Sequence, residues 1–262
     1  MASATGKQDG WKETVKTVFW ALVIAGIFRT LFFQPFWIPS GSMKQTLLIG
    51  DFLFVNKMAY GYSRWSCPFG LCPIPGRILA REPERGDIVV FRHPVSGADY
   101  IKRVIGMPGD TVQMRDGTVW LNGEAIPQEP DGMFVETYER QGSAGQFPRC
   151  MNAPVGQGGQ CIKARYIETL PGGRQFPVLN IEDGGFADNT ALFTVPEGHF
   201  FFIGDNRDNS VDSRSPQNVG GVGMVPFENL IGRANRVVFS SAGSSMLAFW
   251  TWRGDRFFYR LQ

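Results

Sequence analysis

The chain has 262 residues, of which 43% are hydrophobic and 19% are charged, so it is long enough to bury a large hydrophobic core. Its 26 basic and 24 acidic residues leave a net charge of +2, without the clustered basic excess that is typical of nucleic-acid-binding proteins. The 32 Gly, 22 Phe and 17 Pro residues favour strands and tight turns over helices.

The first predicted element is an apolar segment at residues 17–33, which only Arg29 interrupts. As a helix it would span about 26 Å, slightly less than the hydrocarbon core of a bilayer, and Arg29 near its end can reach the headgroups. Bulky residues and Pro35 follow it, instead of the small-residue motif of a cleaved signal peptide. We therefore expect an uncleaved membrane anchor; a removed signal peptide and a buried core helix are the alternatives.

Beyond this segment, short apolar runs alternate with turn residues, and the pairs Asp116-Gly117 and Asn122-Gly123 are strong hairpin signals. Residues 132–185 are looser and rich in Gly, Gln and Pro, and we interpret them as part of an inserted subdomain with long loops. Apolar residues 246–252 could lie on a membrane surface or pack against the core. Strands are predicted at residues 51–55, 87–91, 100–105, 111–114, 118–121, 124–126, 165–170, 175–179, 191–195, 199–203 and 230–239.

The four cysteines form two local pairs whose spacings do not match a zinc ribbon. In an oxidising compartment, short local loops favour disulfides between Cys67 and Cys72 and between Cys150 and Cys161. Free buried thiols are the alternative.

The motif at residues 39–43, Pro-Ser-Gly-Ser-Met, is the first candidate for chemistry. The chain contains only two histidines, His93 and His199, so a nucleophilic Ser42 would more plausibly use a lysine as its base. Gly41 would let backbone N–H groups converge on a substrate carbonyl. Taken alone, the motif also fits an ordinary turn.

Lys102 stands inside the predicted strand at residues 100–105. With the period of two of a strand, it shares a face with Tyr100 and Val104. Desolvation by these neighbours would lower the pKa of Lys102, and only a neutral lysine can act as a general base. A solvated lysine on an edge strand is the alternative.

A dense polar run at residues 204–214 follows the apolar strand at 199–203. Asp205, Asp208 and Asp212 could hold calcium, but their spacing departs from the EF-hand pattern. Arg207 and Arg214 would also repel a cation. We therefore favour a hydrogen-bonded loop in which Asp–Arg pairs fix a site.

Together these segments resemble the bacterial type I signal peptidases, membrane-bound Ser-Lys enzymes that remove signal peptides. Four motifs occur in the family's order behind one anchor, at residues 39–51, 85–91, 100–110 and 204–214, and the resemblance spans roughly residues 36–236. The sequence departs from the family at Lys44-Gln45, where an apolar residue and a proline are usual. Here we expect a looser loop and an added charge near the site.

The resemblance implies a role for nine residues. Ser42 would be the nucleophile and Lys102 the general base and later acid. The oxyanion hole would come from the Ser42 backbone N–H and the Ser40 hydroxyl. The remaining implied roles are the orientation of the lysine amine by Ser210, a supporting ion pair of Asp212 and Arg214, and pockets for small substrate residues at −1 and −3 lined by Ile38, Tyr100 and Ile101.

The implied fold is mostly β, with an antiparallel catalytic core (residues 37–111 and 197–245) and a β-rich insertion (112–196). A cytoplasmic tail and one transmembrane helix (1–36) would precede it, and a C-terminal segment (246–262) would follow. The enzyme would be single-pass in the inner membrane with a periplasmic catalytic domain. Signal peptides of preproteins and the lipid bilayer are the expected partners, and no cofactor, metal or nucleic acid is expected.

Two other functions compete with signal peptide removal. One is a specialised, conjugation-type peptidase with few substrates, which the sequence separates poorly from a general enzyme. The other is an inactive, anchored β scaffold, against which the intact Ser42, Lys102 and Ser210 argue.

Overall fold

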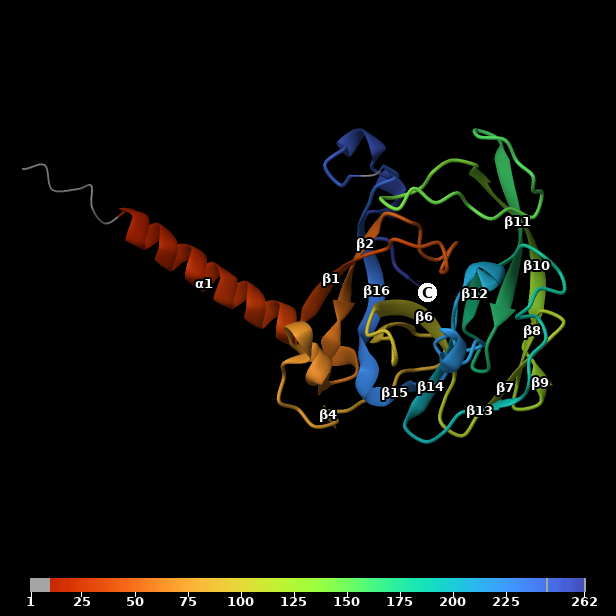
Figure 1. Cartoon of the computed structure of the whole chain (residues 1–262), viewed down its shortest axis with the longest axis horizontal. Coiled ribbons are helices and arrows are strands. Elements are labelled where there is room, and N and C mark those ends of the chain that lie inside the picture. Colours follow the sequence, from red (N-terminus) through yellow and green to blue (C-terminus); the bar gives the residue numbers. More distant parts are fainter. Residues whose placement is uncertain (1–9, 244, 262) are drawn as a thin grey trace, which may run out of the picture.

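The computed structural model describes residues 10–243 and 245–261, and it shows one long helix projecting from a β-rich body (Figure 1). The expected tail at residues 1–9, and residues 244 and 262, lie outside the described part. Helix α1 (Gly10–Leu31) buries none of its residues, and in the described ranges it is the one helix long and apolar enough to cross a membrane. The apolar segment is therefore helical as predicted, although the helix ends at Leu31.

Pro35 does not mark the end of this helix. It lies within strand β1 (Phe33–Trp37), which the aromatic residues after α1 form and which we did not predict. β1 is an edge strand of its sheet, and an edge strand tolerates proline because one row of its N–H groups needs no partner. The chain therefore passes from the helix directly into the main sheet.

The body is built on a seven-stranded sheet of order β1-β2-β16-β5-β6-β14-β15, in which every neighbouring pair is antiparallel. The sequence predicted five of these strands to within one or two residues. Its inner strands β5, β6 and β14 are largely buried on both faces, whereas buried and more exposed residues alternate along β2. Besides β1, its strands are β2 (Asp51–Asn56), β5 (Ile88–Arg92), β6 (Asp99–Gly106), β14 (His199–Ile203), β15 (Val225–Pro226) and β16 (Leu230–Ser240).

Residues between β6 and β14 form two separate sheets. Both predicted hairpins are present, and Asp116-Gly117 and Asn122-Gly123 take positive φ at both turn residues, as tight hairpins of this kind require. One sheet has the order β13-β7-β8-β9, and the other has the order β10-β11-β12. Their strands are β7 (Thr111–Arg115), β8 (Thr118–Leu121), β9 (Glu124–Ala125), β10 (Gln128–Thr137), β11 (Gln160–Thr169), β12 (Gln175–Asn180) and β13 (Phe193–Thr194).

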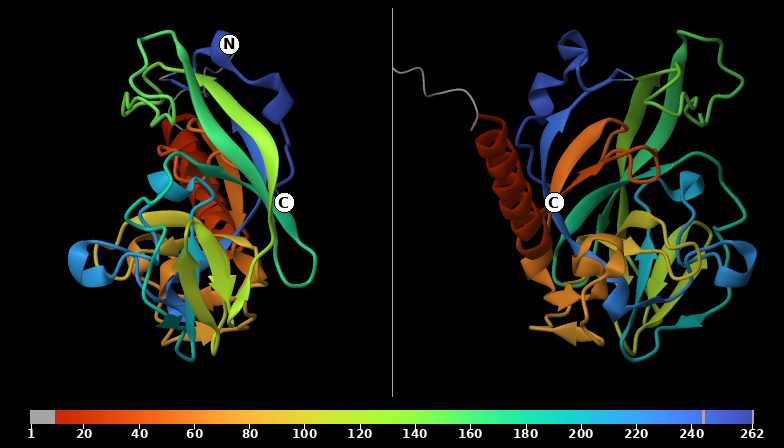
Figure 2. Two further views of the ribbon diagram at one scale, coloured as in Figure 1. Left: turned by 90° about the vertical axis from the view of Figure 1, so that its right-hand side faces the viewer. Right: turned by 60° about the vertical axis from the view of Figure 1, so that its left-hand side comes forward.

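Figure 2 shows β10 and β11 as a long twisted ribbon along one side of the molecule. The sequence did not predict β10, because most of its side chains are exposed and no apolar alternation marks it. A small additional sheet pairs β3 (Tyr62–Ser63) with β4 (Arg77–Ile78).

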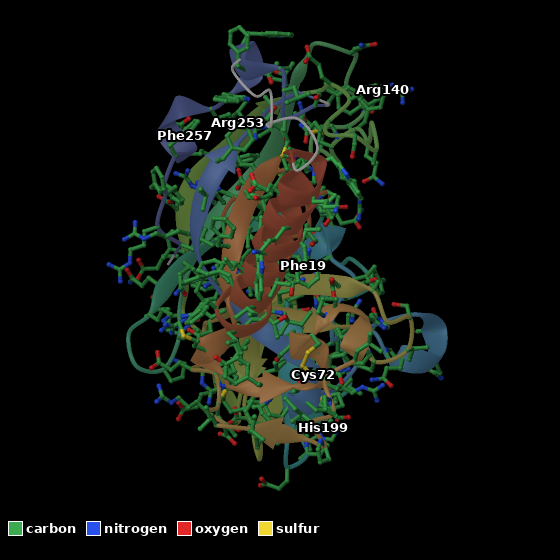
Figure 3. The ribbon with its side chains drawn as sticks, turned by 90° about the vertical axis from the view of Figure 1, so that its left-hand side faces the viewer. Phe19, Cys72, Arg140, His199, Arg253 and Phe257 are labelled. Atoms are coloured by element: carbon green, nitrogen blue, oxygen red, sulfur yellow. A yellow bond between two sulfur atoms is a disulfide. The ribbon has the colours of Figure 1, made fainter. Side chains whose placement is uncertain are left out.

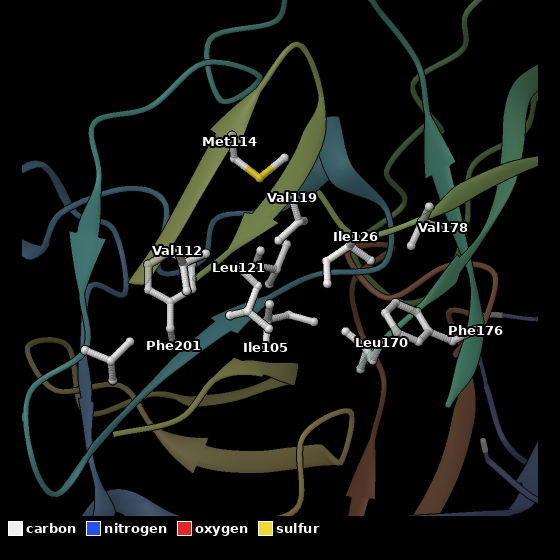
Figure 4. Close-up of a cluster of buried hydrophobic side chains, with 12 residues drawn as sticks. Ile105, Val112, Met114, Val119, Leu121, Ile126, Leu170, Phe176, Val178 and Phe201 are labelled. Atoms are coloured by element: carbon white, nitrogen blue, oxygen red, sulfur yellow. The ribbon is translucent and has the colours of Figure 1, made fainter. Parts of the chain in front are cut away.

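A buried apolar cluster joins the main sheet to the two smaller sheets (Figure 4). Ile105 and Phe201 from the main sheet are 1% and 0% exposed and meet side chains from β7, β8 and β12. Gly106 permits this close packing, because a Cβ there would lie 2.8 Å from Phe201 Cβ. The strand that carries Lys102 is thereby fixed at its far end.

Both predicted disulfides are present, Cys67–Cys72 and Cys150–Cys161, and Figure 3 shows the former beside the label for Cys72. The C-terminal segment has both exposed and buried residues, and its contact with a membrane surface stays a prediction. Leu247 and Trp250 are 88% and 75% exposed, whereas Arg256 is 7% exposed and packs into the body.

Candidate active site

Ser42 and Lys102 are in direct contact in the structure. Ser42 lies in the loop between β1 and β2, and Lys102 lies in the middle of β6, opposite Val89 of β5. Lys102 Nζ is 2.6 Å from Ser42 Oγ, although 60 positions separate the two residues. Lys102 is 3% exposed and Ser42 is 7% exposed, so the contact is shielded from water.

The loop that carries Ser42, residues 38–50, is held in the core by its own apolar side chains. Met43 and Leu47 are fully buried, and Leu47 N–H donates to Met43 O over 2.8 Å. At the end of the loop, Gly50 N–H donates to Ile38 O, and this hydrogen bond closes the loop at its base. We call these residues the serine loop.

A cleft of about 410 Å³ opens beside the serine and the lysine. It is lined by Ser40, Ser42 and Lys102 and by all three residues expected to form the substrate pockets, Ile38, Tyr100 and Ile101. Gln146, Asn209 and Val211 also line it, and the sequence had not singled them out. Ser40 Oγ lies 3.4 Å from Ser42 Oγ, at the same end of the cleft.

A larger hollow of about 870 Å³ lies elsewhere, between β5, β12 and β16. Arginines 174, 233, 236 and 260 line it, and it contains neither the serine loop nor Lys102. The smaller cleft is the better candidate for the active site, because there a buried serine hydroxyl and a buried lysine amine meet an open space.

Burial lowers the pKa of Lys102 from 10.5 to about 8. The negative charges of Asp212 and Asp205 act in the opposite direction and raise it, while Arg214 lowers it. At pH 7 about one lysine in ten would then be neutral, compared with roughly one in three thousand at the ordinary value. The environment of Lys102 thus supplies an amine that can accept a proton.

Asp212 and Arg214 form the predicted ion pair, with Arg214 Nε 2.9 Å from Asp212 Oδ1 and both side chains 1% exposed. Burial alone would raise the pKa of Asp212, but the charge and hydrogen bonds of Arg214 hold it below its ordinary value. The pair therefore carries a negative and a positive charge close to the lysine.

Ser210 lies beside the serine loop, but it is not hydrogen-bonded to Lys102. Its Oγ is buried, and it helps to lower the pKa of the neighbouring Asp212 carboxyl. Lys102 instead donates to Ser42 Oγ and, over 3.1 Å, to Ile101 O. The role of Ser210 in orienting the amine stays a prediction.

Several residues that fix the site were not among the predicted site residues. Asn206 donates from Nδ2 to Gly41 O over 2.8 Å and from its backbone N–H to Ser42 O over 3.0 Å, so it holds both sides of the serine. Arg103 is fully buried on the opposite face of β6 from Lys102 and binds both carboxylate oxygens of Asp205. Asn206 could have been found from its place directly after Asp205 in the polar run.

The polar run therefore forms the hydrogen-bonded loop that we favoured over a calcium site. Asp205 is paired with Arg103, and Asp212 with Arg214. Asp208 Oδ2 accepts from the backbone N–H of Ile181 over 2.7 Å. The carboxylates that a cation would need are occupied by arginines or by backbone donors.

Neither histidine hydrogen-bonds to Ser42 or Lys102 among the described residues. The His93 ring accepts hydrogen bonds from the N–H groups of Val95 and Ser96, each over 3.1 Å, and so it fixes the turn after β5. His199 Nδ1 lies 2.9 Å from Glu197 O, and Figure 3 places this residue at the end of the molecule opposite Arg140 and Arg253.

Comparison with known proteins assigns the chain to a family. The family described as "Signal peptidase, peptidase S26" matches residues 11–239. Signal peptidase I of Rickettsia typhi is 40% identical over 243 residues, covering 87% of this chain and 82% of the relative. Signal peptidase I of Rickettsia akari is 39% identical over 246 residues, covering 90% and 81%. A solved signal peptidase I from Enterococcus faecalis is 27% identical and covers 58% of this chain and 97% of its own, with a TM-score of 0.30.

The fold, the buried serine and the family match define the chain as a serine peptidase of the peptidase S26 class. Within this class it belongs to the signal peptidase I family, which removes signal peptides and is associated with membranes. The resemblance drawn from the four motifs is thereby confirmed.

Gly204 offers a direct test of how closely the site is packed. A Cβ at this position would lie 2.2 Å from Ser210 Oγ and 2.7 Å from Ser42 O. We expect Gly204→Ala to displace the serine and to lower kcat for precursor cleavage by at least about tenfold. Gly156→Ala is the control, because nothing lies within 4 Å of a Cβ there. Equal kcat values for the two purified variants would contradict the prediction.

Proposed function

We propose that this protein is a membrane-anchored endopeptidase that removes signal peptides from exported preproteins with Ser42 as nucleophile and Lys102 as general base. One observation carries the proposal: the 2.6 Å contact between Lys102 Nζ and Ser42 Oγ, buried at the side of an open cleft. A neutral amine at this distance can accept the proton of the hydroxyl that attacks. The lowered pKa of Lys102 supports the same assignment.

In the proposed acylation step, Lys102 Nζ takes the proton of Ser42 Oγ as Oγ bonds to the scissile carbonyl carbon. The carbonyl electron pair moves to the oxygen, and the Ser42 N–H and the Ser40 hydroxyl would stabilise the oxyanion. When this intermediate collapses, the C–N bond breaks and the Lys102 ammonium returns its proton to the departing amine. The mature protein leaves, and the signal peptide stays esterified to Ser42.

In the proposed deacylation step, Lys102 removes a proton from a water molecule that attacks the ester carbonyl. The bond between Ser42 Oγ and the acyl carbon then breaks, and Oγ recovers a proton from the Lys102 ammonium. The signal peptide leaves with a new carboxylate. Asp212 and Arg214 would hold the loop beside the lysine with no net charge of their own.

For substrate binding, we propose that the peptide lies extended along the cleft and pairs with its backbone. Strand β1 and the start of β6 both border the cleft, and β1 is the edge of the main sheet. Ile38, Tyr100 and Ile101 leave room for small apolar side chains, which would select Ala-like residues at −1 and −3. A bulky or charged side chain there would clash or be desolvated without a partner.

For membrane attachment, we propose that α1 spans the inner membrane once and that the β body is periplasmic. α1 has 22 residues, long enough to cross the hydrocarbon core, and none of its side chains is buried in the protein. The exposed aromatic side chains of the C-terminal segment would rest at the membrane surface. We also propose the division into a catalytic core and an insertion at residues 112–196, because these residues form sheets of their own.

The first prediction of this proposal concerns Lys102. Lys102→Met removes the base while keeping the bulk, and Lys102→Arg cannot deprotonate, so both variants should lose turnover while staying folded. In the wild-type enzyme, kcat/KM should rise with pH as the lysine becomes neutral and should level off above about pH 8. Appreciable cleavage by Lys102→Arg, or a rate independent of pH between 6 and 9, would show that the base lies elsewhere.

The second prediction concerns specificity. A precursor with Ala at −1 and −3 should be cleaved, whereas the same precursor with Phe or Lys at −1 should not. The comparison uses purified enzyme and precursors that differ at that one position. Equal rates for the two would rule out a role for Ile38 and Ile101 in forming small pockets, and would also favour a different substrate class.

The third prediction concerns topology. Protease added to spheroplasts should digest the β body, because only α1 and the residues before it would be protected. An antibody or tag at the C-terminal end reports the loss of the body, and a cytoplasmic protein serves as the control for lysis. Full protection of the body would contradict the proposed orientation.

A further inference from the structure

Lys44, the residue that departs from the usual family pattern, is buried two positions after Ser42. Only 3% of the residue is exposed, so its charge does not lie free in the cleft. Lys44 Nζ donates to Glu136 Oε2 and to Gln141 Oε1, each over 2.6 Å. Both acceptors belong to the insertion, Glu136 in β10 and Gln141 in the loop after it. The expected added charge is therefore present, but it is paired.

Glu136 holds a second buried lysine on its other oxygen. Lys163 of β11 is 1% exposed and contacts Glu136 Oε1. Gln141 Nε2 also donates to Glu136 Oε2, over 2.7 Å. Burial would raise the pKa of Glu136, but the two lysines hold it below its ordinary value, so the carboxylate stays charged. Its two oxygens thus divide between two lysines, of which only Lys44 belongs to the serine loop.

The Lys44 side chain packs directly under Gly41, the residue between Ser40 and Ser42. A Cβ at Gly41 would lie 3.3 Å from Lys44 Cε and 3.5 Å from Lys44 Cδ. A second contact joins the insertion to the serine loop, since a Cβ at Gly142 would lie 2.5 Å from Ile49 Cγ2. The position of Lys44 is therefore coupled to the backbone that carries the nucleophile.

We infer that Lys44, held by Glu136 of the insertion, is a positioning residue that fixes the serine loop for attack. The inference rests on the proposed function, in which Ser42 is the nucleophile. Apolar packing alone would let the loop shift along the core, whereas a charged hydrogen bond fixes one distance and one direction. A displacement of about 1 Å at a reacting atom can lower a rate by about 10²-fold.

The closing experiment compares Lys44→Met with Lys163→Met. Both changes remove a buried lysine from the same carboxylate and replace it with an apolar chain of similar length. In each variant Glu136 keeps one lysine and Gln141, so the carboxylate stays paired and both proteins should fold, with similar Tm values. Among the described residues Lys163 hydrogen-bonds to Glu136 and to no residue of the serine loop, which makes Lys163→Met the matched control.

We expect Lys44→Met to lower kcat for precursor cleavage by about tenfold with KM within about twofold of the wild type. KM should hold because Gln141 remains bonded to Glu136 and the cleft wall that carries Gln146 keeps its place. Lys163→Met should leave both kinetic constants within about twofold. If Lys44 only stabilised the protein, both variants should lose kcat to a similar extent, because both remove a buried lysine from Glu136.

Three results would overturn the inference: equal losses of kcat in the two variants, an unchanged kcat in Lys44→Met, or a change confined to KM. Ser42→Ala, measured in the same assay, separates this inference from the proposed function. If Ser42→Ala retains activity, the nucleophile is wrong. If Ser42→Ala is inactive and the two lysine variants behave alike, only the role of Lys44 fails.

Discussion

The burial of one lysine amine against one serine hydroxyl is the constraint around which this site is organised. An ammonium in water holds its proton at neutral pH, and exclusion of water is the largest of the effects that favour the neutral amine of Lys102. Lys102 meets this condition because it lies in the middle of the seven-stranded sheet, with strands on both sides of β6. Its placement in a strand rather than a loop fixes the amine as firmly as the sheet itself.

The carboxylates that hold the surrounding loops counteract the effect of burial on the pKa of Lys102. Asp205 and Asp212 both raise the pKa of Lys102, which works against a neutral amine. Each of these carboxylates is paired with a buried arginine, Arg103 or Arg214, so that its field is partly cancelled. The loop after β14 thus gains charge-assisted hydrogen bonds, and the neutral form of the Lys102 amine is disfavoured only slightly. This explains why polar residues are dense at a site that must exclude water.

Sequence reasoning succeeded where a feature depends on local pattern. Lys102 was placed on a strand because apolar residues surround it with a period of two, and the Asn-Gly and Asp-Gly turns fixed the hairpins. It failed where tertiary contacts determine whether a segment forms a strand. β1 contains a proline and forms only because an edge position accepts it, and β10 lacks apolar alternation because it is largely exposed. The roles of individual site residues came from family resemblance, since spacing alone could not bring Ser42 and Lys102 together.

Lys44 shows why such contacts escape a reading of the sequence. A lysine near a nucleophile suggests a free charge and a loosened loop, and nothing in its neighbours points to Glu136, 92 residues away. A buried ion pair rarely stabilises a protein more than apolar residues of the same size would, because both charges must be desolvated. A buried ion pair instead fixes the distance and direction between its two side chains. In this chain that geometry links β10, which lies outside the seven-stranded sheet, to the loop that carries Ser42. If Ser42 is the nucleophile, as proposed, we expect substitutions at residues 112–196 to alter its position without changing the residues that line the cleft beside Lys102.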